Sequence, residues 1–242
     1  MHRRVRRRNR IFFGVVVLLM FMVAAVILYE AVFVVRRVVI SGEVSASSDQ
    51  ITRFAKVGFG KSIWNIDHDA IKGNLESTGK YALDGVKVDL PGTLILNVRE
   101  RSRNGMVLNG GKILVLDAEG YVVEVCASIP EDGGVFISGL GATSYRLGER
   151  ISAPERSLEA MEVVLNAISN HHAEEYVSEL NLSQLKNIWL TTRTGLRVEL
   201  GDISGMDRKI LWMRTAVADL EQRGNTTGTL DISSGNNADY TP

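Results

Sequence analysis

The sequence has almost none of the residue that cross-links small exported domains. Cys126 is the only cysteine among its 242 residues, so no disulfide can form within the chain. This cysteine ends a strand-like run, residues 121–126, which contains no histidine or basic residue that would activate a thiol. We therefore expect a small buried apolar side chain here. The fold must then depend on an ordinary hydrophobic core, for which about two hundred residues suffice in one or two domains.

Motifs that carry chemistry are also scarce. No Walker A, G-x-S-x-G or H-E-x-x-H pattern occurs. Asp67, His68 and Asp69 are adjacent, so their side chains do not converge on one metal ion, and helix capping explains Asp67 better. His171 and His172 follow a helical pattern and lack a third ligand. The sequence thus predicts no metal site, no cofactor and no enzymatic activity.

Long uncharged runs are absent except near the N-terminus. The nineteen residues from Ile11 to Tyr29 carry no charge, and all but Gly14 are apolar. At about 1.5 Å per residue they span the roughly 30 Å of a bilayer core. Residues 1–10 contain six arginines and no acid, which the positive-inside bias retains in the cytoplasm. The sequence predicts a basic cytoplasmic tail at 1–10, one transmembrane helix at 11–35 and an exported body, a single-pass type II topology in the cell membrane.

Two alternatives fit this N-terminal run less well. A cleaved signal peptide has an apolar region of about 7–15 residues that ends at a small-residue site. Here the run is longer and passes into Arg36 and Arg37 without an A-x-A sequence. A core helix of a soluble protein would leave the arginine cluster without a role. We therefore expect a retained anchor.

The charge beyond the anchor excludes another class of partner. Six of the 28 basic residues precede Ile11 and one of the 28 acids precedes Arg36, which leaves 22 basic and 27 acidic residues in the body. A body with this acidic excess lacks the basic face of a nucleic-acid-binding protein. The basic tail instead suits the anionic headgroups of the lipid bilayer.

After the anchor, the pattern predicts a small β-α-α-β-β domain at 36–102. A β-branched strand at 38–40 ends at Gly42, and two helices follow, the second capped by Asp67. Two alternating strands, 86–90 and 93–99, flank the turn at Pro91. The apolar residues of the two helices are Ile51, Phe54, Ala55, Val57, Ala70, Ile71 and Leu75, and Leu94, Leu96 and Val98 share one face of the last strand.

The sequence motifs of this unit resemble those of the POTRA domain in the cell-division proteins FtsQ and DivIB. Residues 38–42 are similar to the family pattern V-x-V-x-G, residues 60–67 to G-x-x-L-x-x-I-D, and residues 90–101 to W-P-x-T-L followed by V-x-E-R. The sequence departs from the family at 82–86, where P-W-V is common, and at 102–104, where proline is usual. These losses leave the fold assignment intact and weaken the assignment of a docking surface there.

Residues 103–233 predict a mixed, mostly antiparallel β-domain with flanking helices, which makes the whole chain α+β. Strand patterns recur from Val107 onward, and helical spacing follows Pro154 and again covers 208–220. A last strand at 228–232 precedes a tail at 234–242. This helix-then-strand ending is similar to that of FtsQ and DivIB. Tyr240 stands in, several positions later, for the aromatic residue that the family carries there.

The resemblance implies a non-enzymatic divisome scaffold at the division septum. In that family the C-terminal strand region recruits single-pass coiled-coil proteins of the FtsB/DivIC and FtsL types. We expect the last strand to have an unpaired edge, which can bind a partner strand through its backbone. A membrane-tethered envelope enzyme and a POTRA-type envelope assembly factor remain alternatives. The predicted partner-binding residues are Thr229, Leu230, Asp231, Ile232, Ser233 and Tyr240.

Overall fold

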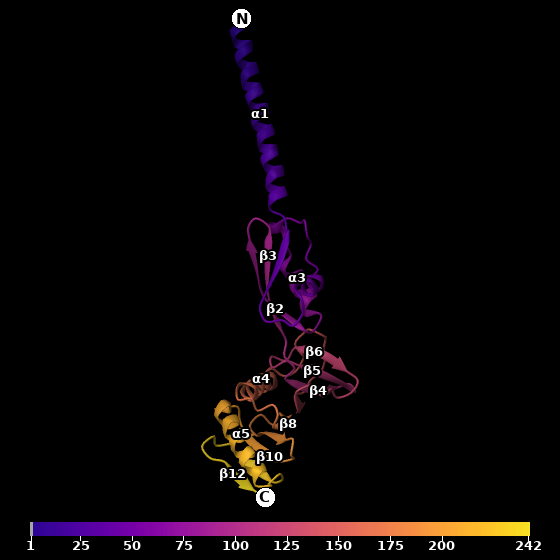
Figure 1. Ribbon diagram of the computed structural model, residues 1–242, viewed down its shortest axis with the longest axis vertical. Coiled ribbons are helices and arrows are strands. Elements are labelled where there is room, and N and C mark those ends of the chain that lie inside the picture. The colour runs from indigo at the N-terminus through magenta and orange to yellow at the C-terminus, as the bar shows by residue number, and fades with distance from the viewer. Residues whose placement is uncertain (1) are drawn as a thin grey trace. The chain divides into compact units, whose positions relative to one another are not determined.

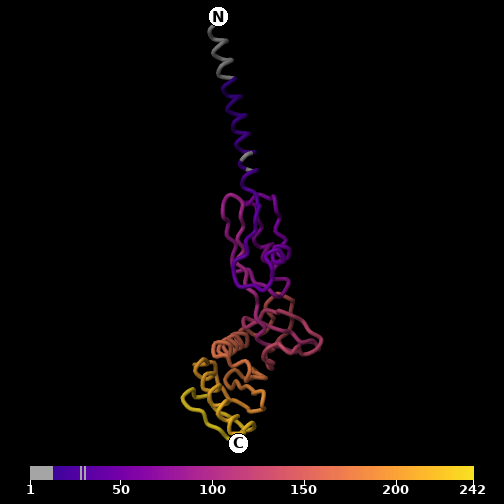
Figure 2. The backbone as a smooth tube through the Cα atoms, in the orientation of Figure 1, coloured from indigo at the N-terminus to yellow at the C-terminus, as the bar shows by residue number. Residues whose placement is uncertain are grey.

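The computed structural model describes the backbone of residues 2–242 and the side chains of residues 13–27, 29 and 31–242 (Figure 1). The chain forms two compact units, whose courses can be followed along the backbone in Figure 2. The first contains the residues up to Leu75 together with Ala82–Arg99, and the second contains Glu76–Tyr81 and Glu100–Pro242. The fold class is α+β, as predicted.

The chain begins with a helix, α1 (His2–Val32). No helix in the described part of the chain combines the length and the apolar character that crossing a membrane requires. Most of the apolar side chains between Phe13 and Ile27 are exposed. The predicted tail, residues 1–10, lies outside the residues whose side chains are described.

α1 ends at Val32, three residues before the predicted Val35. The backbone then pairs with a loop of the first unit: the N–H of Val35 donates to the carbonyl of Lys61, and the N–H of Ile63 donates to the carbonyl of Phe33, both over 2.9 Å. Val35 is only 1% exposed. The end of the apolar run therefore belongs to the core of the first unit, and this competing burial stops the helix.

The first unit has the predicted β-α-α-β-β order. The three strands hydrogen-bond in the order β1-β3-β2, with β1 parallel to β3. Leu94, Leu96 and Val98 are fully buried on one face of β3, as their alternation predicts. The elements are β1 (Arg37–Ser41), α2 (Ser48–Ala55), η1 (Ile63–Asn65), α3 (His68–Glu76), β2 (Tyr81–Asp89) and β3 (Thr93–Glu100).

Local capping explains where the two short helices begin. The Ser47 hydroxyl accepts from the N–H of Gln50 over 3.4 Å, and the Gln50 side chain accepts from the N–H of Ser47 over 3.2 Å, so the two form a capping box. Asp67 accepts from the N–H of Ala70 over 2.9 Å, the cap that the sequence predicts. α2 ends earlier than expected, because Lys56 adopts the left-handed conformation before Gly58 is reached.

The second unit is built on a nine-stranded sheet. Its strand order is β12-β11-β10-β9-β8-β7-β4-β5-β6, with parallel pairs at β4·β7, β7·β8 and β10·β11. Side chains from the sheet and from two helices, α4 (Glu155–Asn170) and α5 (Met206–Gln222), share one hydrophobic core. The strands are β4 (Gly105–Asn109), β5 (Lys112–Leu116), β6 (Val122–Cys126), β7 (Val135–Ser138), β8 (Val177–Asn181), β9 (Ile188–Thr192), β10 (Arg197–Gly201), β11 (Thr229–Asp231) and β12 (Asp239–Thr241).

Cys126 is less buried than the sequence predicts. It lies at the end of β6 and is half-buried. It packs against a small satellite cluster formed by Met106, Ile113 and Val115. The main core of the second unit therefore does not depend on this thiol.

A buried ion pair lies where the chain enters the second unit. Arg101 Nη1 donates to Asp117 Oδ2 over 2.5 Å, and both side chains are less than 5% exposed. The guanidinium also lies over the ring of Tyr121, 3.8 Å from its centre, while Asp117 Oδ1 accepts the N–H of Tyr121. Burial raises the pKa of Asp117, and the Tyr121 N–H and the guanidinium partly offset this. Arg101, directly after β3, thus has a structural role in the second unit.

Removing one member of this pair should be costly, because it leaves the other charged and buried. We expect Arg101→Met to lower the free energy of unfolding of the second unit by about 3–5 kcal/mol. Adding Asp117→Asn should recover part of the loss, since asparagine still accepts the Tyr121 N–H without a charge. Urea unfolding in a Trp64→Phe background measures this, because Trp189 and Trp212 both lie in the second unit. A loss below about 1 kcal/mol for Arg101→Met would contradict the assignment.

Candidate partner-binding edge

The strand predicted to have a free edge is not the last strand of the sheet. β11 pairs in parallel with β10 on one side and antiparallel with β12 on the other. β12 lies within residues 234–242, which the sequence predicts to be a tail. The unpaired edge at this end of the sheet therefore belongs to β12 among the described residues, and the predicted open edge at β11 is wrong.

The hydrogen bonds to β10 determine which groups β12 presents. The N–H of Arg197 donates to the carbonyl of Gly228, and the N–H of Ile232 donates to the carbonyl of Glu199. Backbone groups alternate sides along a strand, so the even-numbered residues of β11 face β10 and the odd-numbered ones face β12.

Asp239 and Thr241 lie opposite Asp231 and Thr229, so their backbone groups face β11. The N–H and carbonyl of Tyr240 consequently point outward at the free edge. The next outward position is Pro242, which has no N–H to donate. β12 therefore offers a short edge, centred on the backbone of Tyr240.

Gly228 allows β12 to approach so closely. It has a φ of +104°, and a Cβ at this position would lie 2.4 Å from the carbonyl oxygen of Thr241 and 3.0 Å from the backbone of Pro242. Any other residue would push β12 away from β11 and would also be strained at this φ. Glycine immediately before β11 is thus a requirement for the observed edge.

The inward side chains of this edge are anchored in the core. Leu230 and Ile232 are 1% and 0% exposed, and Tyr240 packs half-buried against the same cluster. The Tyr240 hydroxyl donates to the carbonyl of Thr227 over 2.8 Å. Tyr240 therefore fastens β12 both through its ring and through its hydroxyl.

The outward side chains form two rows across the last three strands. Glu199, Asp231 and Asp239 occupy one row, which places like charges opposite each other. Arg197 neutralises only the first of them, with its Nε 2.6 Å from Glu199 Oε1. Thr229 and Thr241 lie beside Arg197 in the second row. The free edge is therefore acidic on its solvent face.

Five of the six residues predicted to bind a partner lie together in the structure, in or beside the paired strands β11 and β12. Thr229, Leu230 and Asp231 form β11, Ile232 extends it into the core, and Tyr240 lies directly opposite Leu230. Ser233 begins a polar turn, where its N–H donates to Asp231 Oδ1. The residues that the sequence does not reveal are Asp239 and Thr241. These residues form a three-residue strand without apolar alternation. The one sequence signal for this strand is the isolated aromatic residue Tyr240, which follows Gly228 and β11.

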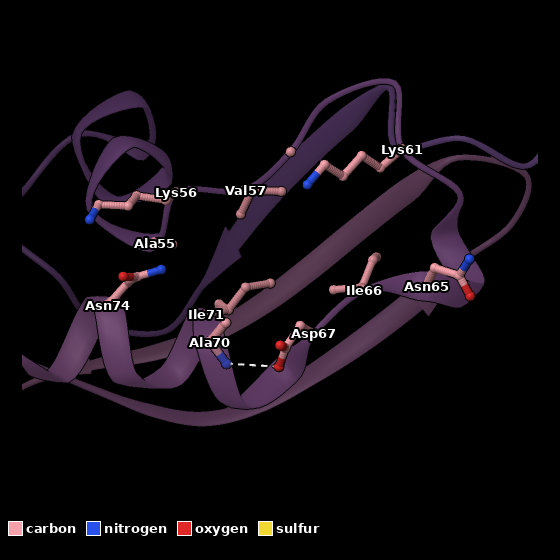
Figure 3. Close-up of a pocket in the computed structure, with 11 residues that line it drawn as sticks. Ala55, Lys56, Val57, Lys61, Asn65, Ile66, Asp67, Ala70, Ile71 and Asn74 are labelled. Atoms are coloured by element: carbon pink, nitrogen blue, oxygen red, sulfur yellow. Dashed lines mark hydrogen bonds between the residues drawn. The ribbon is translucent and has the colours of Figure 1, made fainter.

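A hollow in the first unit, between the end of α2 and α3, is the other candidate site (Figure 3). Lys61 and Asn65 lie at one end of it, and Lys56 and Asn74 lie at the other. Asp67 is already used as the cap of α3. The polar groups that line the hollow do not converge on one point, so the hollow is a poorer candidate for a binding site than the sheet edge. Within the described residues, no group of three or more potential metal ligands comes together.

Comparison with known proteins defines the class of the first unit. Residues 33–101 match the family model described as "POTRA domain, FtsQ-type". The match begins at Phe33, where the backbone leaves α1 and pairs with the loop at Ile63. The first unit is therefore similar to an FtsQ-type POTRA domain.

One relative is similar to this chain over most of its length. The cell division protein DivIB of Clostridium tetani (strain Massachusetts / E88) is 22% identical over 204 residues, which cover 83% of this chain and 76% of the relative. A solved structure, the major extracytoplasmic domain of the trans isomer of DivIB from Geobacillus stearothermophilus, aligns with a TM-score of 0.33 and 14% identity over 51% of this chain and 97% of that one. The predicted resemblance to the FtsQ/DivIB family of cell-division proteins is confirmed.

Amide hydrogen exchange tests the register of β12. We expect the amides of Asp239 and Thr241 to exchange at least about tenfold more slowly than that of Tyr240, because only the first two face β11. Backbone-assigned NMR of the folded protein measures all three rates. Slow exchange at Tyr240 with fast exchange at its two neighbours would show that the strand is shifted by one residue.

Proposed function

We propose that this protein is a non-enzymatic scaffold of the bacterial division machinery. It holds a single-pass coiled-coil partner of the FtsB/DivIC or FtsL type at the septum by adding a strand of that partner to β12. The observation that carries the proposal is the unpaired edge of β12 at one end of a nine-stranded sheet. The match of residues 33–101 to the FtsQ-type POTRA model and the similarity to DivIB supply the cellular context.

α1 is the membrane anchor in this proposal. Its described apolar side chains from Phe13 to Ile27 are largely exposed, which in water would cost free energy along the whole helix. The six arginines of residues 1–10 place the N-terminus in the cytoplasm, so both units lie outside the cell membrane. The protein is then a single-pass type II membrane protein that meets other divisome components and the lipid bilayer.

The chemistry of the edge describes the partner strand. Its backbone pairs with the outward N–H and carbonyl of Tyr240. A residue beside Asp239 on the solvent face should be lysine or arginine, because Asp231 and Asp239 have no basic neighbour in their row. On the opposite face, an apolar side chain extends the core beyond the ring of Tyr240.

The predicted residues divide into two roles in this proposal. Tyr240 contacts the partner directly, through its backbone. Thr229, Leu230, Asp231, Ile232 and Ser233 form the strand and turn that hold β12 in position. The function therefore depends on β11 as a support, with the partner bound one strand further out.

Gly228→Ala tests this arrangement without touching the partner-facing residues. The added Cβ meets the carbonyl of Thr241, so β12 is displaced, and we expect binding to weaken at least about tenfold, or 1.4 kcal/mol. The full-length protein is purified together with its coiled-coil partners, and the fraction retained is titrated. Gly195→Ala is the matched control: Gly195 has a φ of +103°, but its nearest neighbour would be 3.8 Å away.

Deleting residues 237–242 separates the two possible edges. The deletion removes β12 and leaves the edge of β11 open, and we expect binding to be lost. Unchanged or stronger binding would mean that the partner pairs with β11, and would refute the assignment to β12. Equal losses from Gly195→Ala and Gly228→Ala would show that backbone strain alone, and not displacement of β12, causes the defect.

A further inference from the structure

The POTRA domain carries a second surface next to the end of α1, a shallow basic hollow of about 460 Å³. Its lining comes from the start of β1, from α2 and from the loop after α2. We call it the juxtamembrane pocket, and the residues used below are Arg36, Arg37, Asp49, Thr52, Arg53 and Phe59.

The charge in the juxtamembrane pocket is mostly unpaired. Arg36 donates to the carbonyl of Ala31 in the last turn of α1 over 2.9 Å. The side chains of Arg37, Arg53 and Asp49 have no hydrogen-bond or ion-pair partner among the described residues, although the backbones of both arginines are hydrogen-bonded. Three guanidinium groups against one carboxylate leave the hollow positive, in a body that is acidic as a whole.

Aromatic rings gather at the same end of α1. The ring centres of Tyr29 and the half-buried Phe33 lie 4.7 Å apart with the rings tilted by 46°, and the centre of the Trp64 ring lies 6.2 Å from that of Phe33. Trp64 is 55% exposed and Phe59, in the pocket wall, is 57% exposed. Large rings left in contact with water are costly unless another surface covers them. Tryptophan and tyrosine with neighbouring arginines form the composition that is enriched where a protein meets lipid headgroups.

The hydrogen bonds place these groups at the level of the helix end. The guanidinium of Arg36 reaches Ala31, and the loop at Lys61–Ile63 pairs with Phe33 and Val35 directly after α1. α1 and the POTRA residues belong to one compact unit. If α1 crosses the bilayer, the aromatic rings and the pocket lie in the headgroup layer of the outer leaflet.

We propose that the juxtamembrane pocket binds the phosphate of an anionic phospholipid headgroup, with Trp64 and Phe59 inserted in the interface beside it. Arg37 and Arg53 supply both the charge and the donors, since the Thr52 hydroxyl in the pocket wall already donates to the carbonyl of Ser48 over 2.7 Å. The inference rests on the proposed membrane anchor and adds a lipid-binding role to it. Its consequence is that the POTRA domain is held against the membrane and does not swing freely on α1.

The test uses the full-length protein with Trp189→Phe and Trp212→Phe, which leaves Trp64 as the single tryptophan. It is reconstituted in vesicles of phosphatidylcholine, alone or mixed with phosphatidylglycerol, and Trp64 is quenched by lipids brominated near the headgroup. We expect blue-shifted, quenched emission that strengthens as phosphatidylglycerol is added. Arg37→Gln and Arg53→Gln should each weaken the apparent affinity for phosphatidylglycerol about fivefold.

The matched control is Lys87→Gln with Arg99→Gln, which removes two charges from the same domain outside the pocket. It should respond to phosphatidylglycerol like the unmodified protein. Unquenched Trp64, or equal responses from the pocket and control variants, would overturn the inference. So would loss of the response on adding inorganic phosphate, because the pocket would then be a site for free anions. Carbonate extraction is run in parallel: a protein that stays in the vesicles with Trp64 unquenched refutes the pocket alone, whereas release of the whole protein refutes the anchor.

Discussion

Backbone hydrogen bonds link all nine strands from β6 to β12 into one sheet, and the proposed binding edge of the second unit is the place where this pairing stops. Among the described residues, each interior strand of this sheet is bonded to a neighbour on both sides, so its two outer strands are the main places for another chain to pair. At the C-terminal end that strand is three residues long and is followed by proline. A short edge of this kind limits uncontrolled pairing while leaving one donor and one acceptor, those of Tyr240, for a partner that fits.

β12 is held in position by groups other than its outward backbone. Gly228 permits the close approach of Thr241, and Tyr240 is fastened by its ring and by its hydroxyl. A turn that bonds to itself through Ser233, Ser234 and Asn237 returns the chain from β11 to β12. Pre-ordering lowers the conformational entropy that this strand itself would lose on binding another strand, so a small contact can be specific.

Local patterns in the sequence predict the POTRA domain well. Ser47, Gln50 and Asp67 cap helices through residues three positions away, and the alternation of Leu94, Leu96 and Val98 determines the buried face of β3. Both features depend on neighbours along the chain. The end of α1 is different, because Val35 is as apolar as the residues before it. Only the loop at Lys61, far along the chain, takes it out of the helix.

The sequence predicts the open edge of the second sheet at β11, one strand too early, because only β11 has a recognisable strand pattern. β11 has the β-branched and apolar residues of a strand, whereas Asp239, Tyr240 and Thr241 have no pattern of their own. Their pairing depends on contact with β11 across a polar turn, and on a glycine whose importance shows only when Thr241 is beside it. Sequence periodicity reports the alternation of apolar and polar residues within one element. It therefore cannot reveal a strand that forms only because it pairs with a neighbouring strand.

The two proposed surfaces carry opposite charge, and this has a physical consequence for an anchored protein. The free edge presents Asp231 and Asp239, whereas the juxtamembrane pocket presents Arg36, Arg37 and Arg53. Near an anionic membrane, the pocket is attracted and the edge is repelled within about 10 Å, the screening length at ordinary salt. In these two proposals lipid and partner do not compete for one site, because the pocket attracts anionic headgroups and the edge attracts a basic strand.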